Sequence, residues 1–65
     1  MRTIDEAQLL VAIRQFDSDG MPATVDSLAV YLHWDEGRVR GALAAPLHER
    51  AVYFIGPFLH VEPSE

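Results

Sequence analysis

Apolar residues recur at spacings of three and four along most of the chain, which is the helical period. This pattern occupies three stretches, residues 4–16, 25–32 and 35–45. Residues 52–61 alternate instead and are divided by Gly56-Pro57, which predicts a β hairpin. The expected order is therefore three helices followed by a hairpin, an α+β arrangement. The helical positions expected to be buried are Leu9, Leu10, Ile13, Phe16, Val25, Leu28, Ala29, Leu32, Val39, Ala42 and Leu43.

Polar residues mark the start of each predicted helix. Thr3 and Glu6 fit a capping box, in which the Thr3 hydroxyl accepts from the Glu6 amide and the Glu6 carboxylate reaches back. Thr24 and Asp35 occupy the N-cap positions of the second and third helices. Gly20 can adopt the left-handed conformation that closes the first helix.

Two prolines interrupt the regular pattern. Met21-Pro22-Ala23 is expected to form a short first strand that pairs with the hairpin, and the proline limits it to an edge. Pro46 cannot continue a regular helical ladder, so the third helix should stop or kink there, with a last turn that runs to Arg50. Residues 62–65 are polar and contain proline, which predicts a loose tail.

The hairpin and the turn before the third helix supply the rest of the expected core. On a period of two, the residues facing the core are Val52, Phe54, Leu59 and Val61, and those on the other face are Tyr53, Ile55 and His60. Phe58 is also expected in the core, because a domain this small needs its aromatic residues, whereas Tyr53 is left undecided. Trp34 is expected to be a buried or half-buried plug between the two helices, with a partner-binding role as the alternative.

The order Leu28-Ala29-x-x-Leu32, a short turn, and a capped helix with Val39 and Leu43 four residues apart resembles a helix-turn-helix unit. With the hairpin as a wing of two or three strands, the whole chain, residues 1–65, resembles a single winged helix-turn-helix domain. The resemblance implies a DNA-binding protein, a transcriptional regulator that acts as a small dimer on double-stranded DNA.

The same resemblance makes residues 35–45 the recognition helix. Arg40 would then read base edges, because an arginine can make a bidentate pair with guanine. Arg38 and Arg50 would contact phosphates, and Gly41 lies on the same exposed side. The wing departs from the family pattern, since residues 52–61 contain neither arginine nor lysine.

Charge favours a second interpretation. The 65 residues include ten acidic residues and five arginines, and the net charge is −5 with a pI near 4.9. A duplex-binding protein usually carries a basic footprint. Either the domain binds protein instead of DNA, or a salt-adapted or GC-rich source explains the missing lysine.

The protein-binding alternative uses other residues. Gly37, Gly41 and Ala45 are spaced four apart and make a stripe of small residues along the third helix. Each glycine inside a helix lowers stability by about 1 kcal/mol relative to alanine. Close approach of a partner backbone, which only small residues allow, would compensate for this loss. The alternative is that the glycines arose by sequence drift on a solvent-exposed face. Tyr53 is the matching candidate on the wing, where an apolar patch would serve a protein partner or a second copy.

Several other functions are not expected from this sequence. There is no cysteine, and His33, His48 and His60 do not share a metal-ligand spacing. Asp17-Ser18-Asp19 lacks the further ligands of a calcium loop and is interpreted as a turn. No nucleophile is paired with a base, so neither an enzyme nor a cofactor is expected. No membrane span or signal peptide is recognisable, which makes a cytoplasmic protein the default expectation.

Overall fold

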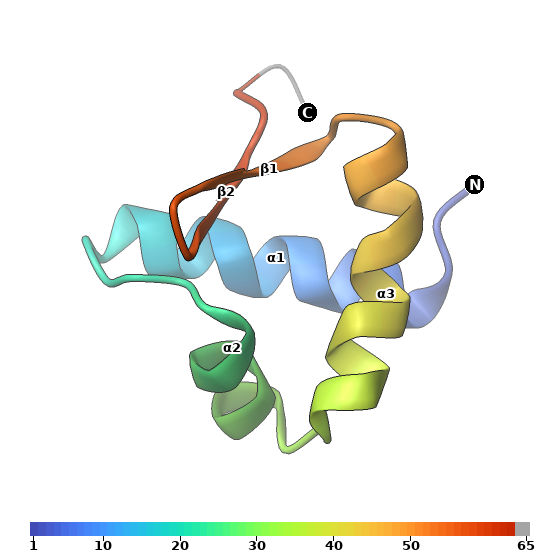
Figure 1. The fold of residues 1–65 in the computed structure, drawn as a ribbon, viewed down its shortest axis with the longest axis horizontal. Helices are drawn as coiled ribbons and strands as arrows, with labels where there is room; N and C mark the ends of the chain where they lie inside the picture. Colours follow the sequence, from blue (N-terminus) through green and yellow to red (C-terminus); the bar gives the residue numbers. More distant parts are fainter. Residues whose placement is uncertain (64–65) are drawn as a thin grey trace.

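In a computed structural model that describes residues 1–63, three helices are followed by a two-stranded antiparallel sheet (Figure 1). The chain is therefore an α+β fold with the winged-helix-like arrangement that the apolar pattern predicts. The elements are α1 (Ile4–Ser18), α2 (Val25–Leu32), α3 (Glu36–His48), β1 (Val52–Ile55) and β2 (Phe58–Val61). Figure 1 shows α3 crossing the N-terminal half of α1, with the hairpin over the C-terminal half.

The predicted caps all form. The Thr3 hydroxyl accepts from the Glu6 amide at 3.1 Å, and the Thr3 amide donates to the Glu6 carboxylate. Thr24 caps α2 and makes a second capping box with Ser27. The Asp35 carboxylate accepts from the Arg38 amide at 2.7 Å, which fixes the start of α3. These side chains satisfy backbone donors that have no partner inside the helices.

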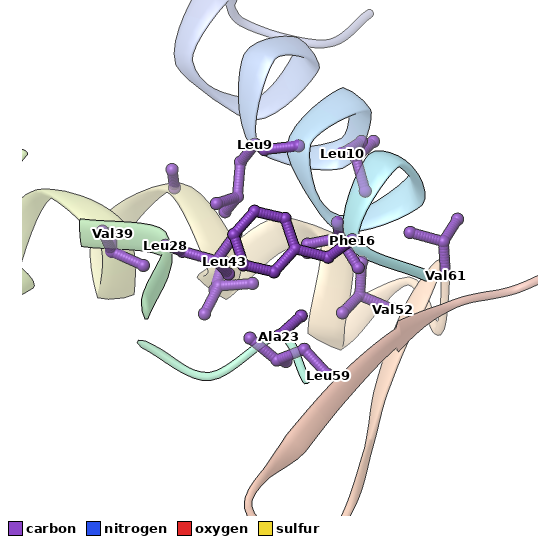
Figure 2. Close-up of a cluster of buried hydrophobic side chains, with 13 residues drawn as sticks. Leu9, Leu10, Phe16, Ala23, Leu28, Val39, Leu43, Val52, Leu59 and Val61 are labelled. Carbon is purple, nitrogen blue, oxygen red and sulfur yellow. The ribbon is translucent and has the colours of Figure 1, made fainter. Parts of the chain in front are cut away.

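The core lies where α1 meets the other elements (Figure 2). Leu9 and Ile13 of α1 are fully buried, together with Leu28 of α2 and Leu43 of α3. Figure 2 shows Phe16 pointing into this cluster from the end of α1. The predicted plug, Trp34, is half-buried and packs against the core after the left-handed residue His33, whose φ is 59°. The predicted helical core is confirmed, with Val25, Ala29 and Leu32 partly buried at its margin.

Helix α3 does not stop at Ala45, so the predicted boundary is wrong by three residues. The helix continues through Pro46 to His48. Proline removes one backbone donor from the ladder, but the Pro46 side chain is fully buried and its carbonyl accepts from the Ala51 amide at 2.9 Å. Burial of the ring offsets the missing hydrogen bond. Helix α1 likewise runs two residues past Phe16, and Gly20 then has the expected positive φ of 71°.

The predicted first strand, residues 21–23, does not form. Pro22 has no amide to donate, and the segment makes a single backbone hydrogen bond to β2, from the Leu59 amide to the Ala23 carbonyl at 2.7 Å. Ala23 is nevertheless buried. The segment therefore covers one edge of β2 without becoming a strand, and within residues 1–63 the wing has two strands.

The hairpin turns at Gly56-Pro57 as predicted, but fewer of its side chains are buried than expected. Val52 pairs with Val61 and Phe54 with Leu59, across a turn in which Gly56 has a φ of 61°. Phe54 and Phe58 were both expected in the core, and both predictions are wrong, because 46% and 40% of their surfaces are exposed. The alternation places Phe54 on the same face as Val52, but its pair with Leu59 is next to the last pair before the turn, so Phe54 lies near the end of the hairpin. The predicted tail lies partly outside the described residues.

Candidate functional site

The exposed face of α3 presents small residues between two arginines. Gly37, Gly41 and Ala44 lie along this face and are all exposed. Arg38 and Arg40 are two positions apart on the helix, so their side chains leave on opposite flanks of the face. The structure therefore does not place these two predicted DNA contacts side by side.

Arg38 is held by the rest of the molecule. Its guanidinium donates two hydrogen bonds of 3.0 Å to the Asp5 carboxylate in α1. The same group lies 4.3 Å from the centre of the Trp34 ring, within cation–π range. Arg38 thus joins the start of α3 to the start of α1 and to the turn, and a phosphate contact would have to replace these interactions.

The electrostatics of this pair follow from its geometry. The hydrogen bonds from Arg38 hold the pKa of the Asp5 carboxyl below its usual range, and the nearby positive charge adds to this effect. Conversely, the hydrogen bond to Asp5 raises the pKa of Arg38. Both side chains remain partly exposed, so solvent screens the attraction. The pair therefore acts as a bidentate clamp at the surface.

Arg40 and Arg50 are more accessible but lie far apart. The Arg40 side chain is 67% exposed and pairs with Glu36 one turn earlier at 3.2 Å. Arg50 lies after the end of α3 in a left-handed conformation, with a φ of 62°, and its amide donates to the Leu47 carbonyl at 3.2 Å. Its guanidinium makes no hydrogen bond or ion pair with residues 1–63. Residues 35–50 carry three acidic side chains and three arginines. The predicted recognition surface is thus neutral overall.

The glycine stripe has open space in front of it. A Cβ added at Gly41 would meet no atom within 4 Å, and one at Gly37 would meet only the Asp35 carboxylate at 3.3 Å. No part of the described chain therefore requires glycine at position 41. Ala45, the third member of the stripe, is half-buried and lies at its margin.

The hairpin exposes a larger apolar surface than α3 does. Four large side chains of the hairpin are 38–58% exposed, namely Tyr53, Phe54, Ile55 and Phe58. Tyr53 stacks on His60, with ring centres 5.7 Å apart, and His60 Nδ1 lies 3.3 Å from the Asp17 carboxylate. Residues 52–61 contain no Asp, Glu, Lys or Arg. We call Tyr53, Phe54, Ile55 and Phe58 the hairpin patch.

A second apolar region lies on the opposite side of α1 from its buried stripe. A shallow groove there is lined by Ala7, Gln8, Val11, Leu32 and Trp34. Val11 is 62% exposed, and its side chain leaves the helix away from the core. Sequence reasoning missed this groove, although Val11 is visible as a valine outside the buried stripe.

Other kinds of site find no support in the described residues. Within residues 1–63, no group of three or more metal-ligating side chains gathers closely enough to hold an ion. In the same part of the chain, no helix is both long and apolar enough to cross a membrane.

Comparisons of the chain with protein-family models, curated proteins and solved structures find no match. The winged-helix resemblance therefore rests on the order, caps and spacing of the elements alone.

Proposed function

We propose that this chain is a protein-interaction module on a winged-helix-like scaffold, and that it acts without direct contact to DNA. The observation that carries the proposal is the hairpin patch. It exposes four large apolar side chains on a hairpin without formal charge, in a chain whose net charge is −5. Exposed apolar patches on small domains often mark partner surfaces.

The electrostatics of the same elements support this choice. A wing that grips phosphate needs cationic side chains, because neutralised phosphates supply most of the affinity for a duplex. The hairpin has none, and Arg38 is already bound to Asp5. DNA binding remains the second candidate because Arg40 is well exposed and Arg50 is unpaired within residues 1–63.

An amide-resolved NMR titration with a mixed-sequence duplex separates the two functions. At low salt, where phosphate contacts are strongest, we expect no focused shift changes at Arg38, Arg40, Gly41 or Arg50. Shift changes centred on these residues, and lost in Arg40→Ala, would replace the proposal with a DNA-binding function. Repeating the titration in multimolar potassium chloride tests whether the chain is a salt-adapted protein that binds DNA only at high salt.

A photo-crosslinking residue placed at Tyr53 tests the protein contact directly. In cells of the native host we expect protein adducts from this position, because the hairpin patch would lie against the partner. The matched control places the same residue at Arg14, an exposed side chain in α1 outside the hairpin. Equal labelling from both positions, or none from position 53, would contradict the proposal.

A further inference from the structure

A shallow cleft lies between β2 and the segment that follows α1. Its walls include Met21 and Pro22 from that segment, Phe58 of β2, and Asp17 near the end of α1. Met21 and Phe58 are large apolar side chains that are 53% and 40% exposed. Phe58 also belongs to the hairpin patch, so the cleft continues the surface on which the proposed function rests.

The backbone of the chain holds one wall of this cleft in place. The Met21 amide donates to the Phe16 carbonyl at 2.8 Å, and the Ala23 carbonyl accepts from the Leu59 amide at 2.7 Å. Between these two anchors, the ring of Pro22 fixes one backbone angle. The wall therefore needs little ordering when a partner binds, which lowers the entropy cost of association.

A single carboxylate gives this apolar cleft its negative charge. The Asp17 side chain is 38% exposed, and its one side-chain partner within residues 1–63 is His60, whose Nδ1 lies 3.3 Å from a carboxylate oxygen. In the same part of the chain no arginine pairs with Asp17, and Arg14, three residues earlier in α1, makes no ion pair. A carboxylate can accept several hydrogen bonds, so Asp17 has acceptor capacity left for a donor from another molecule.

We infer that this cleft binds an arginine or lysine side chain of the protein partner, next to apolar residues that cover the hairpin patch. The inference rests on the proposed function and specifies the chemistry of the partner. Long basic side chains combine an apolar stem with a charged head. The stem packs against Met21 and Phe58, and the head donates to the Asp17 carboxylate.

The charge of the whole chain favours the same partner. The net charge is −5, and residues 52–61 contain no Asp, Glu, Lys or Arg. A basic segment is therefore attracted toward the chain, and an acidic segment is repelled. A phosphate group in the cleft would lie against the Asp17 carboxylate, so the cleft does not suit a nucleic acid. The hairpin patch thus supplies apolar contact area, and the cleft selects the sign of the partner's charge.

Selection of peptides from a random library displayed on phage, with the full chain as the target, tests the inference. The enriched peptides should carry an arginine or lysine beside aromatic or aliphatic residues. In an amide-resolved NMR titration, a selected peptide should shift the amides of Gly20, Met21 and Phe58. Replacing its basic residue by glutamine should weaken binding at least about fivefold, measured by fluorescence anisotropy, because the ion pair is lost.

Asp17→Asn removes the carboxylate and should weaken the same peptide at least about fivefold. The peptide that carries glutamine should bind the wild type and Asp17→Asn equally, because the two changes remove one shared interaction. Asp26→Asn is the matched control, since it removes the same charge from an exposed position at the start of α2, outside the cleft. It should change the affinity less than about twofold, because solvent and salt screen a distant charge. Amide NMR spectra show whether both variants keep the fold.

A library that yields no binder, peptides that bind the hairpin patch without a basic residue, or equal losses from Asp17→Asn and Asp26→Asn would overturn the inference. Protein crosslinks from position 53 that persist at the wild-type yield in Asp17→Asn would also overturn it and leave the proposed function standing. No protein crosslink from that position would remove the proposed function and the inference with it.

Discussion

The exposed face of α3 and the hairpin patch differ in how the molecule uses their side chains. On α3, Arg38 is bound to Asp5 and Trp34, and Arg40 is paired with Glu36. The hairpin patch contains no charged side chain, and its aromatic and aliphatic side chains are exposed to solvent. In a winged-helix-like arrangement, the element expected to read DNA is thus largely occupied, while the element expected to grip phosphate is apolar.

A fold does not by itself fix a function, because the two depend on different side chains. The helices and hairpin follow from caps and apolar spacing, which say nothing about the outer surface. Function belongs to the surface residues that the scaffold presents. On this chain the hairpin residues are apolar and Arg38 and Arg40 are already paired, and for this reason we propose protein contact over phosphate contact.

The largest expected effect on stability comes from the buried side of the hairpin and should be absent from its exposed side. Leu59 is fully buried beneath it, so Leu59→Ala should lower the free energy of unfolding by about 2–5 kcal/mol, measured by urea denaturation. Ile55→Thr, on the same hairpin but 58% exposed, should change it by less than about 0.5 kcal/mol. Similar losses from both variants would mean that the hairpin patch belongs to the core.

On α3, Gly41→Ala should stabilise the chain by about 1 kcal/mol, because alanine is the better helix former and the added methyl group meets open space. Gly37→Ala should gain less, since its methyl group would lie 3.3 Å from the capping Asp35 carboxylate. Thermal unfolding measures both differences. If Gly41→Ala is instead destabilising, the glycine has a structural role that the exposed face does not reveal.

Sequence reasoning predicted the scaffold well because its signals are local. Capping residues such as Thr3 and Asp35, and the buried stripe of α1, act within one helix turn. The errors came where tertiary packing decides. Pro46 stays helical because its ring is buried. Residues 21–23 do not form a strand, because Pro22 has no amide and the Met21 amide donates to the Phe16 carbonyl instead.

The candidate site was less predictable for the same reason. Arg38 and Asp5 are 33 residues apart, so no local pattern indicates that one binds the other. The period of two puts Phe54 on the same face as Val52, but it does not indicate that 46% of the Phe54 surface stays exposed. Both features depend on how elements meet in three dimensions.

The smallest expected effect on stability comes from the Arg38–Asp5 pair, which decides whether Arg38 is available to a ligand. The hydrogen bonds from Arg38 lower the pKa of Asp5 in the folded chain, whereas the unfolded chain should titrate near the usual value of about 3.9. The pair therefore contributes stability above that value, and the contribution is lost as the pH falls through the lower folded pKa. Asp5→Asn should be less stable than the wild type at pH 7, and the difference should close in acid.

Carbon-detected NMR titration of the Asp5 carboxyl measures this directly. We expect a midpoint below the usual value in the wild type and a return toward that value in Arg38→Gln, because the carboxylate then loses its donor. An unshifted midpoint in the wild type would mean that Arg38 is not held by Asp5 in solution. Arg38 would then be free to contact phosphate, and the contrast between α3 and the hairpin would weaken in favour of DNA binding.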